Sequence, residues 1–75
     1  MYMENLQHLT KTNSSWITEM YQRSRTLVEV VAHGYDTYLI ETKTEDALNE
    51  WFRAESKGKW FHANKSELEI NRVYN

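Results

Sequence analysis

Apolar and polar residues alternate in short runs along the chain, and the period differs from run to run. Residues 26–33 are rich in branched side chains and carry apolar groups on both faces of an extended chain, which is typical of an inner strand. Residues 37–42 form a second such run, and Gly34 and Asp36 lie between the two. A glycine close to an aspartate between two such runs is a hairpin signal. The pattern therefore predicts an antiparallel hairpin.

The period becomes helical in the segment that follows. Over 45–56, the apolar residues fall on one side of a helix, as Ala47, Leu48, Trp51 and Phe52. Two threonines precede Glu45 and Asp46, an order that supplies a cap and places acids at the positive end of the helix dipole. Gly58, flanked by lysines, is a typical stop signal. The sequence predicts a helix over 45–56 with its apolar side on the sheet.

The remaining segments are less regular. In 15–24 the polar residues 13–15 can cap a short helix, which would place four apolar residues on one face, namely Trp16, Ile17, Met20 and Tyr21. A strand with less clean alternation is the competing interpretation. Residues 60–63 fit a further short strand or an ordered loop. Residues 67–74 alternate as a half-buried strand, with Leu68 and Ile70 inward.

Length and composition agree with one small folded domain. The chain has 75 residues, 40% hydrophobic and 13% aromatic, with no proline and two glycines, so nothing marks a linker. We expect an α+β domain over 14–75, preceded by a flexible arm over 1–13. Its small antiparallel sheet should have three to four strands and one main helix packed on one face, besides the short N-terminal helix. Without cysteine, neither a disulfide nor a thiolate zinc site can stabilise it.

Charge is unevenly distributed, although the net charge is only −2. Residues 34–56 hold six acids and two bases, whereas 57–75 hold four bases and two acids. A reader of double-stranded DNA usually carries a strong basic excess, so that class is disfavoured. No apolar stretch approaches the roughly 18 residues of a membrane span, and the first residues do not resemble a secretion signal. We therefore expect a cytoplasmic protein without membrane contact.

The titratable residues form no catalytic or metal-binding pattern. His8, His33 and His62 are scattered. Asp36 stands three residues from His33, but a histidine at a strand end beside a turn is typically a surface residue. Catalysis needs groups that converge in a pocket. We therefore expect a protein that is not an enzyme and that uses no metal or cofactor.

Aromatic and acidic residues are the stronger functional signal. Ten large rings exceed what a core of this size can enclose, so some should be exposed, and the candidates near turns or chain ends are Tyr2, Tyr35 and Tyr74. Tyrosine suits interfaces because its ring supplies area and its hydroxyl tolerates water. We predict a partner-binding surface with one aromatic anchor and acidic steering groups, made by Tyr35, Asp36, Glu45, Asp46 and Glu50. The simpler interpretation is that the acids form the solvated face of a helix.

A basic segment supports an alternative function. Three lysines are interleaved with two rings in the order Lys57, Lys59, Trp60, Phe61 and Lys65. Single-stranded nucleic acid binders use this combination for phosphate attraction and base stacking. The competing interpretation is that Trp60 or Phe61 fills the core beneath a helix end. The nucleic acid alternative therefore requires an accessible Trp60.

Two segments, ETKTEDAL at 41–48 and EINRV at 69–73, carry a resemblance to small phage-encoded inhibitors of host machinery. A strand that runs into a threonine-capped helix, followed by a closing strand, is similar to the arrangement in phage inhibitors of bacterial RNA polymerase and in small anti-CRISPR proteins. The resemblance covers residues 29–73. It implies a non-enzymatic protein that binds and blocks a larger host protein. A homodimer stays open as well.

Overall fold

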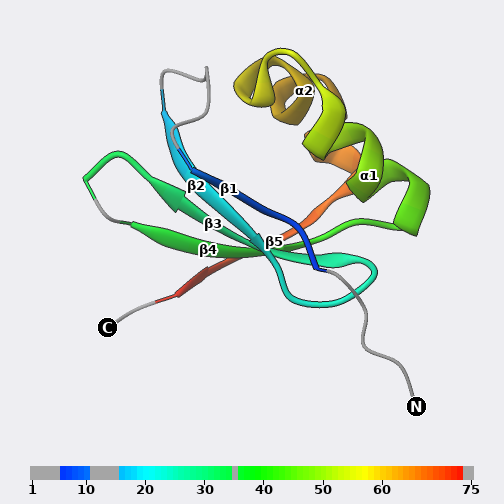
Figure 1. The fold of residues 1–75 in the computed structure, drawn as a ribbon, viewed down its shortest axis with the longest axis horizontal. Helices are drawn as coiled ribbons and strands as arrows, with labels where there is room; N and C mark the ends of the chain where they lie inside the picture. The colour runs from blue at the N-terminus through cyan, green and yellow to red at the C-terminus, as the bar shows by residue number, and fades with distance from the viewer. Residues whose placement is uncertain (1–5, 11–15, 35, 74–75) are drawn as a thin grey trace.

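The computed structural model describes residues 6–10, 16–34 and 36–73, and within these ranges the chain forms one sheet and two helices (Figure 1). The strands are β1 (His8–Thr10), β2 (Ile17–Gln22), β3 (Leu27–Ala32), β4 (Thr37–Glu41) and β5 (Glu69–Val73). They lie side by side in chain order, each antiparallel to the next. The connection from β4 to β5 holds α1 (Glu45–Arg53), α2 (Lys57–Asn64) and a short 3₁₀ helix (Lys65–Glu67).

Both helices lie on the same face of the sheet, so the molecule has two layers (Figure 1). This arrangement confirms the predicted α+β class, the antiparallel sheet and the helix on one face. The prediction of three to four strands and one main helix is too low, because the described residues form five strands and two helices. Neither helix has the length and the apolar character that crossing a membrane requires, within the ranges described.

The core lies between the helices and the strand residues that point toward them. Met20, Val28 and Val30 are fully buried on the sheet, and Leu48 and Trp51 are fully buried on α1. Cross-strand pairing of Met20 with Val30 makes this apolar surface continuous from β2 to β3. The predicted apolar side of α1 is therefore confirmed.

The predicted hairpin is also confirmed. β3 and β4 pair with Val30 opposite Tyr38. Gly34 in the turn has a φ of 88°, a left-handed conformation that glycine adopts without a Cβ clash. At the start of α1, the Oγ1 of Thr44 accepts a hydrogen bond from the backbone N–H of Ala47 (3.1 Å). A threonine therefore caps this helix, as the sequence predicts.

β2 replaces the short helix that the apolar spacing favours near residues 15–24. The cause is a bulge: Ile17 pairs with Ala32 whereas Glu19 pairs with Val31, so one extra residue is inserted in β2. The bulge brings Ile17 and Met20 to the same buried face although they are three residues apart. Because three-residue spacing is also typical of a helix, the pattern misleads. The competing strand interpretation is correct.

A helix, α2, replaces the short strand or loop predicted for 60–63. α1 ends at Arg53, earlier than the sequence predicts, and the chain turns before α2 begins. The Oγ of Ser56 caps α2 by accepting a hydrogen bond from the backbone N–H of Lys59 (3.3 Å). Gly58 is buried in the first turn of α2 and does not end α1.

β1 lies within the segment that the sequence predicts to be a flexible arm. Leu9 pairs with Met20 and packs against the core. Just before β1, the backbone N–H of Gln7 donates to the Oε1 of Gln22 (3.0 Å), and its Nε2 donates to the Oδ1 of Asn49 on α1 (3.0 Å). These bonds connect β1 to both layers. Residues 1–5 and 11–15, including the predicted helix cap at 13–15, lie outside the described residues.

Candidate functional site: an apolar groove beside the last strand

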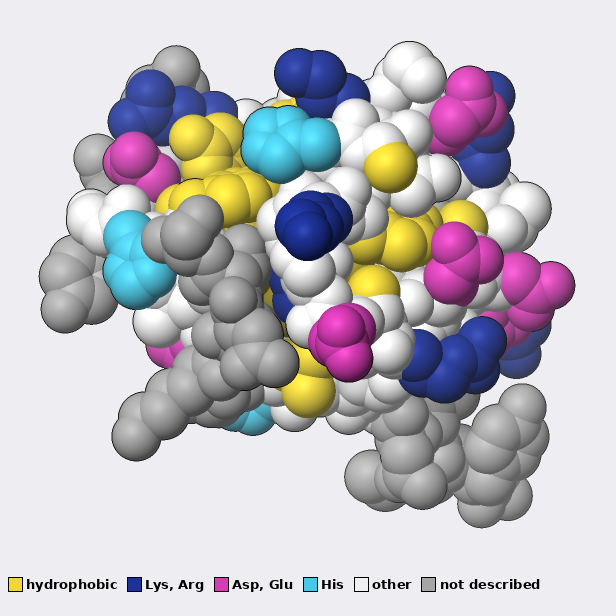
Figure 2. All heavy atoms as spheres, turned by 90° about the horizontal axis from the view of Figure 1, so that it is seen from above, with side chains coloured by type: hydrophobic (Ala, Val, Ile, Leu, Met, Phe, Trp, Pro, Cys, Tyr) yellow, Lys and Arg dark blue, Asp and Glu magenta, His cyan; other side chains and the backbone are white. Residues whose placement is uncertain are grey.

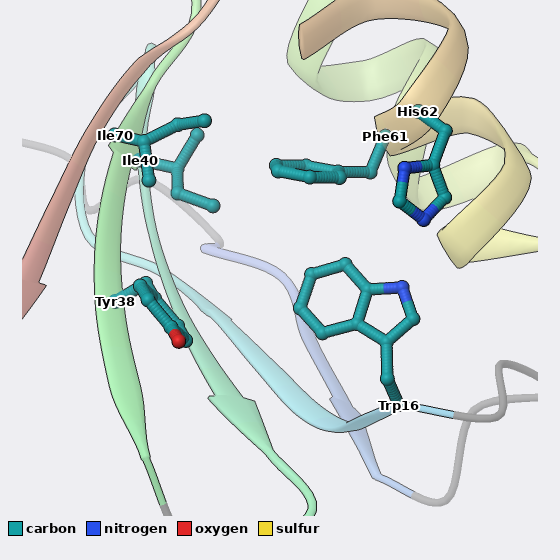
Figure 3. A pocket seen from close by; sticks show the side chains of 6 residues that line it. All are labelled: Trp16, Tyr38, Ile40, Phe61, His62 and Ile70. Atoms are coloured by element: carbon teal, nitrogen blue, oxygen red, sulfur yellow. The ribbon is translucent and has the colours of Figure 1, made fainter.

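An apolar groove lies between α2 and the side of the sheet formed by β4 and β5. Its volume is about 280 Å³. Six side chains line it (Figure 3): Trp16, Tyr38, Ile40, Phe61, His62 and Ile70. They come from the entrance to β2, from β4, from α2 and from β5. The groove is thus a product of the tertiary fold.

Aromatic rings form the wall on the helix side. The ring of Phe61 extends from α2 toward the strands and meets Trp16 edge to face, with ring centroids 5.0 Å apart (Figure 3). Phe61 also lies 6.0 Å from the ring of Trp51, which in turn stacks on Trp60 at 4.9 Å. The wall therefore continues into the buried aromatic core, which holds it in place.

The opposite wall consists of Tyr38, Ile40 and Ile70 (Figure 3). Ile40 and Ile70 are directly paired between β4 and β5. Ile40 is only 1% exposed, whereas Ile70 is 41% exposed. Since β5 is the last strand of the sheet, Ile70 has a neighbouring strand on one side only among the described residues. Solvent therefore reaches the apolar groove at Ile70.

The acidic residues predicted to bind a partner do not come together in one surface. Asp36 precedes β4, and its Oδ1 accepts a hydrogen bond from the Nη2 of Arg72 on β5 (2.9 Å). Glu45 and Asp46 follow the other end of β4, where they open α1. The acids thus lie at two ends of one strand. The predicted anchor Tyr35, like Tyr2 and Tyr74, lies outside the described residues.

Trp60 belongs to the core. Its side chain is 9% exposed and stacks on Trp51. Its Nε1 donates a hydrogen bond to the Oε2 of Glu50 (2.8 Å), so this acid, predicted to bind a partner, also supports the core. The base-stacking ring that the nucleic acid alternative requires is therefore not accessible.

The lysines predicted to contact nucleic acid have different environments. Lys57 is buried at the start of α2, and its Nζ donates a hydrogen bond to the carbonyl oxygen of Ala54. Burial lowers the pKa of Lys57, because removal from water disfavours the charged ammonium. Lys59 and Lys65 are exposed. Lys57 therefore does not share an exposed surface with Lys59 and Lys65.

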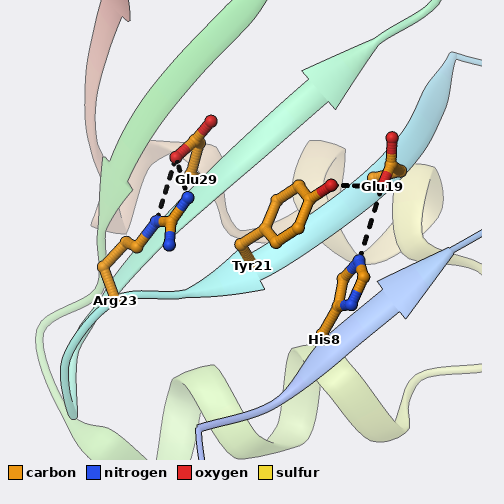
Figure 4. Close-up of polar contacts among 5 residues, drawn as sticks. All are labelled: His8, Glu19, Tyr21, Arg23 and Glu29. Atoms are coloured by element: carbon orange, nitrogen blue, oxygen red, sulfur yellow. Dashed lines mark hydrogen bonds and ion pairs between the residues drawn. The ribbon is translucent and has the colours of Figure 1, made fainter.

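The face of the sheet away from the helices carries polar contacts (Figure 4). The hydroxyl of Tyr21 donates to Glu19, whose Oε1 also lies 3.4 Å from the Nε2 of His8. The bond from Tyr21, followed by the bond from His8, lowers the pKa of Glu19, and the bond to Glu19 raises the pKa of Tyr21. Nearby, the Nη2 of Arg23 lies 2.6 Å from the Oε1 of Glu29. Polar contacts thus occur on this face, whereas the groove is lined mainly by apolar side chains.

The sequence gives no local signal for the groove. Trp16 and Phe61 stand out as aromatic residues, but their positions in the chain do not indicate that they meet. Tyr38, Ile40 and Ile70 share the groove only because β4 and β5 pair after a connection of 27 residues, 42–68. Among the described residues, no group of three histidine or acidic side chains is placed to hold a metal ion.

On the helical side of the molecule, Lys and Arg side chains are interspersed with Asp and Glu (Figure 2). Hydrophobic side chains emerge between them in separate patches. The charge on this side therefore does not favour one class of charged ligand. A comparison with known protein families, curated proteins and solved structures finds no match to the chain.

Proposed function

We propose that this chain is a small, non-enzymatic module that binds a larger protein. The observation that carries the proposal is the apolar groove, where aromatic rings and the exposed Ile70 surround about 280 Å³ of space open to solvent. One large apolar side chain of a partner would fill this space. Burial of such a side chain contributes roughly 1.5–3 kcal/mol. A few buried side chains of this kind carry most of the binding free energy in protein interfaces.

The nature of the partner is part of the proposal. In line with the resemblance to phage-encoded inhibitors, we propose a larger host protein in the cytoplasm that is blocked when this chain occupies its surface. The exposed acids Glu45 and Asp46 would then steer association toward a basic region, because exposed charges act over about a Debye length. Single-stranded nucleic acid binding ranks second, because it requires an accessible Trp60.

The groove can be tested with a displayed library of random dodecapeptides selected on the purified chain. Affinities of the selected peptides are then measured by fluorescence anisotropy for the wild type, Ile70→Ser and Leu6→Ser. Ile70→Ser should weaken binding by about tenfold, because it removes one apolar contact of the groove. Leu6→Ser is the matched control, since Leu6 is similarly exposed (44%, against 41% for Ile70) but does not line the groove.

Two results would contradict the proposal. The first is a library that yields no peptide with measurable affinity for the wild type. The second is a set of peptides whose affinities are the same for Ile70→Ser and for Leu6→Ser. Nuclear magnetic resonance titration of the labelled chain provides a direct check, because the side-chain N–H of Trp16 should shift when the groove is filled.

A further inference from the structure

The outer edge of β5 presents backbone groups that face away from the sheet. The N–H of Ala32 donates to the carbonyl of Asp36, and that of Thr42 donates to the carbonyl of Thr26, both at 2.8 Å. In an antiparallel pair the hydrogen-bonded residues alternate along the strand, so the backbone N–H and carbonyl groups of even-numbered residues of β4 point toward β3. The backbone groups of odd-numbered residues of β4 point toward β5. Since Leu39 pairs with Asn71, the odd positions of β5 face β4.

The backbone N–H and carbonyl of Ile70 consequently point toward the outer edge. Among the described residues, no strand lies on that side. An edge of this kind is a template for a further strand, which supplies main-chain hydrogen bonds. The side chain of Ile70 lies on the helix side of the sheet and lines the groove. A strand added at this edge would therefore direct alternate side chains toward the groove.

Near this edge, on the face of the sheet away from the helices, two acids lie side by side. Glu41 on β4 is directly paired with Glu69 on β5. Like charges in opposite positions of neighbouring strands destabilise the pair. Glu41 accepts a hydrogen bond from the hydroxyl of Thr26 (3.2 Å), whereas Lys43, at the same end of the sheet, pairs with Glu67 (2.8 Å). A cation next to Glu69 would offset the repulsion between the two carboxylates.

We propose that the partner contributes an extended segment that pairs with β5 as a sixth strand, with a large apolar side chain over the groove and a lysine or arginine beside Glu69. The two side chains belong to neighbouring residues of the segment, because successive residues of a strand point to opposite faces. This inference rests on the proposed function and specifies the chemistry of the partner.

A second copy of this chain does not fit the same edge as well. In antiparallel pairing of two β5 strands, the residues beside Glu69 would be those of the same face, which are Glu69, Asn71 and Val73. None of these is a cation. Arg72, the only basic residue of β5, lies on the helix side, where its Nη2 contacts Asp36. Charge complementarity therefore favours a basic partner segment over self-association.

The test uses the selected dodecapeptides and their backbone N-methylated versions. N-methylation removes one hydrogen-bond donor at a time, so it should weaken binding by about tenfold at alternate positions and have little effect at the positions between. A peptide that binds as a helix or a loop would not show this period of two. Loss of affinity without the alternation would overturn the strand addition, although the proposed function would stand.

The cation is tested by charge reversal. Glu69→Lys should weaken a peptide that carries lysine or arginine next to its apolar anchor by about tenfold, and replacement of that basic residue by glutamate should restore the affinity for Glu69→Lys. Glu55→Lys makes the same change of charge at an exposed position between the helices and should have no such effect.

Each remaining outcome is decisive. Equal losses with Glu69→Lys and Glu55→Lys, or no recovery with the charge-swapped peptide, would overturn the role of Glu69. A stable dimer in analytical ultracentrifugation that Glu69→Lys leaves intact and that excludes the peptides would assign the edge to a second copy. Failure to select any peptide would instead contradict the proposed function itself.

Discussion

β3 allows a residue-by-residue comparison of the two faces of the sheet. Val28 and Val30 point toward the helices and are fully buried, whereas Leu27, Glu29 and Val31 point the other way and remain half-buried. The helix side is held by packing of apolar side chains, whereas the side away from the helices carries polar contacts between His8 and Glu19 and between Arg23 and Glu29. The same residue type should therefore matter much more for stability on one face than on the other.

Removal of the central ring on the helix side should have the largest effect. Trp51 is fully buried, stacks on Trp60, and donates a hydrogen bond from Nε1 to the carbonyl of Lys57 (3.0 Å). Trp51→Ala should lower the free energy of unfolding by about 3–5 kcal/mol, because it leaves a large cavity. Urea denaturation followed by circular dichroism measures the change, and Trp51→Phe should lose less. A parent-like midpoint for Trp51→Ala would show that the ring is not central to the core.

The two valines next to one another on β3 test the comparison directly. Val30→Ala should cost about 2 kcal/mol, because two buried methyl groups are lost and a cavity remains. Val31→Ala removes the same groups from the half-buried face and should cost less than about 1 kcal/mol. Since both changes replace valine by alanine in the middle of the same strand, the difference between them reports how the side chain packs on each face. Equal thermal shifts for the two variants would contradict the asymmetry of the sheet.

The sequence predicts α1 and the β3–β4 hairpin best. α1 has a strong apolar period and a threonine cap, and the β3–β4 hairpin has a glycine-containing turn, so local patterns are sufficient for both. α2 carries no comparable period: its buried residues are Lys57, Gly58 and Trp60, and only the last of them is apolar and large. Its position depends on packing against α1, which no local pattern encodes.

Local sequence patterns do not predict the outer edge of β5 or the groove, because both depend on how the strands pair. The bulge in β2 changes which residues share a face, and it can be identified only once β2 and β3 are paired. The wall of the groove at Ile70 depends on β5 closing the sheet after two helices. The predicted acidic surface assumes that residues near in sequence are near in space. Asp36 and Glu45 instead lie beyond opposite ends of β4.

The helix caps should give an intermediate effect, because they stabilise the layer that covers one face only. Thr44→Ala and Ser56→Ala each remove an acceptor for a backbone N–H at the start of a helix, and each should cost about 1 kcal/mol. Ser66→Ala, at an exposed position without a capping role, is the control and should change the stability by less than about 0.5 kcal/mol. Thermal unfolding followed by circular dichroism distinguishes them. If Thr44→Ala and Ser56→Ala change the stability as little as Ser66→Ala, then α1 and α2 are held in place by packing alone.

The smallest effect concerns the face of the sheet away from the helices, and it depends on pH. The pKa of Glu19 is lowered from its usual value of 4.5, chiefly by the bond from Tyr21, so this carboxylate stabilises the fold above that value. The contribution is lost as the pH falls through the depressed pKa of the folded state. The pKa of Tyr21 is raised from 10.0 by the same bond, so its contribution is present below that value and is lost as the pH rises through the folded-state pKa.

Tyr21→Phe should therefore flatten the dependence of stability on pH at both ends, between about pH 3 and pH 5 and above about pH 10. The acid limb should not become fully flat, because His8 still contacts Glu19. Urea midpoints measured across both ranges report the change, and Tyr38→Phe removes a hydroxyl from the helix side as the control. Since Glu19 and Tyr21 lie near solvent, the change in the free energy of unfolding across these pH ranges should be small compared with that caused by Val30→Ala. If stability depends on pH in the same way for Tyr21→Phe and the wild type between about pH 3 and pH 5, the bond between Glu19 and Tyr21 does not contribute to the stability of the fold.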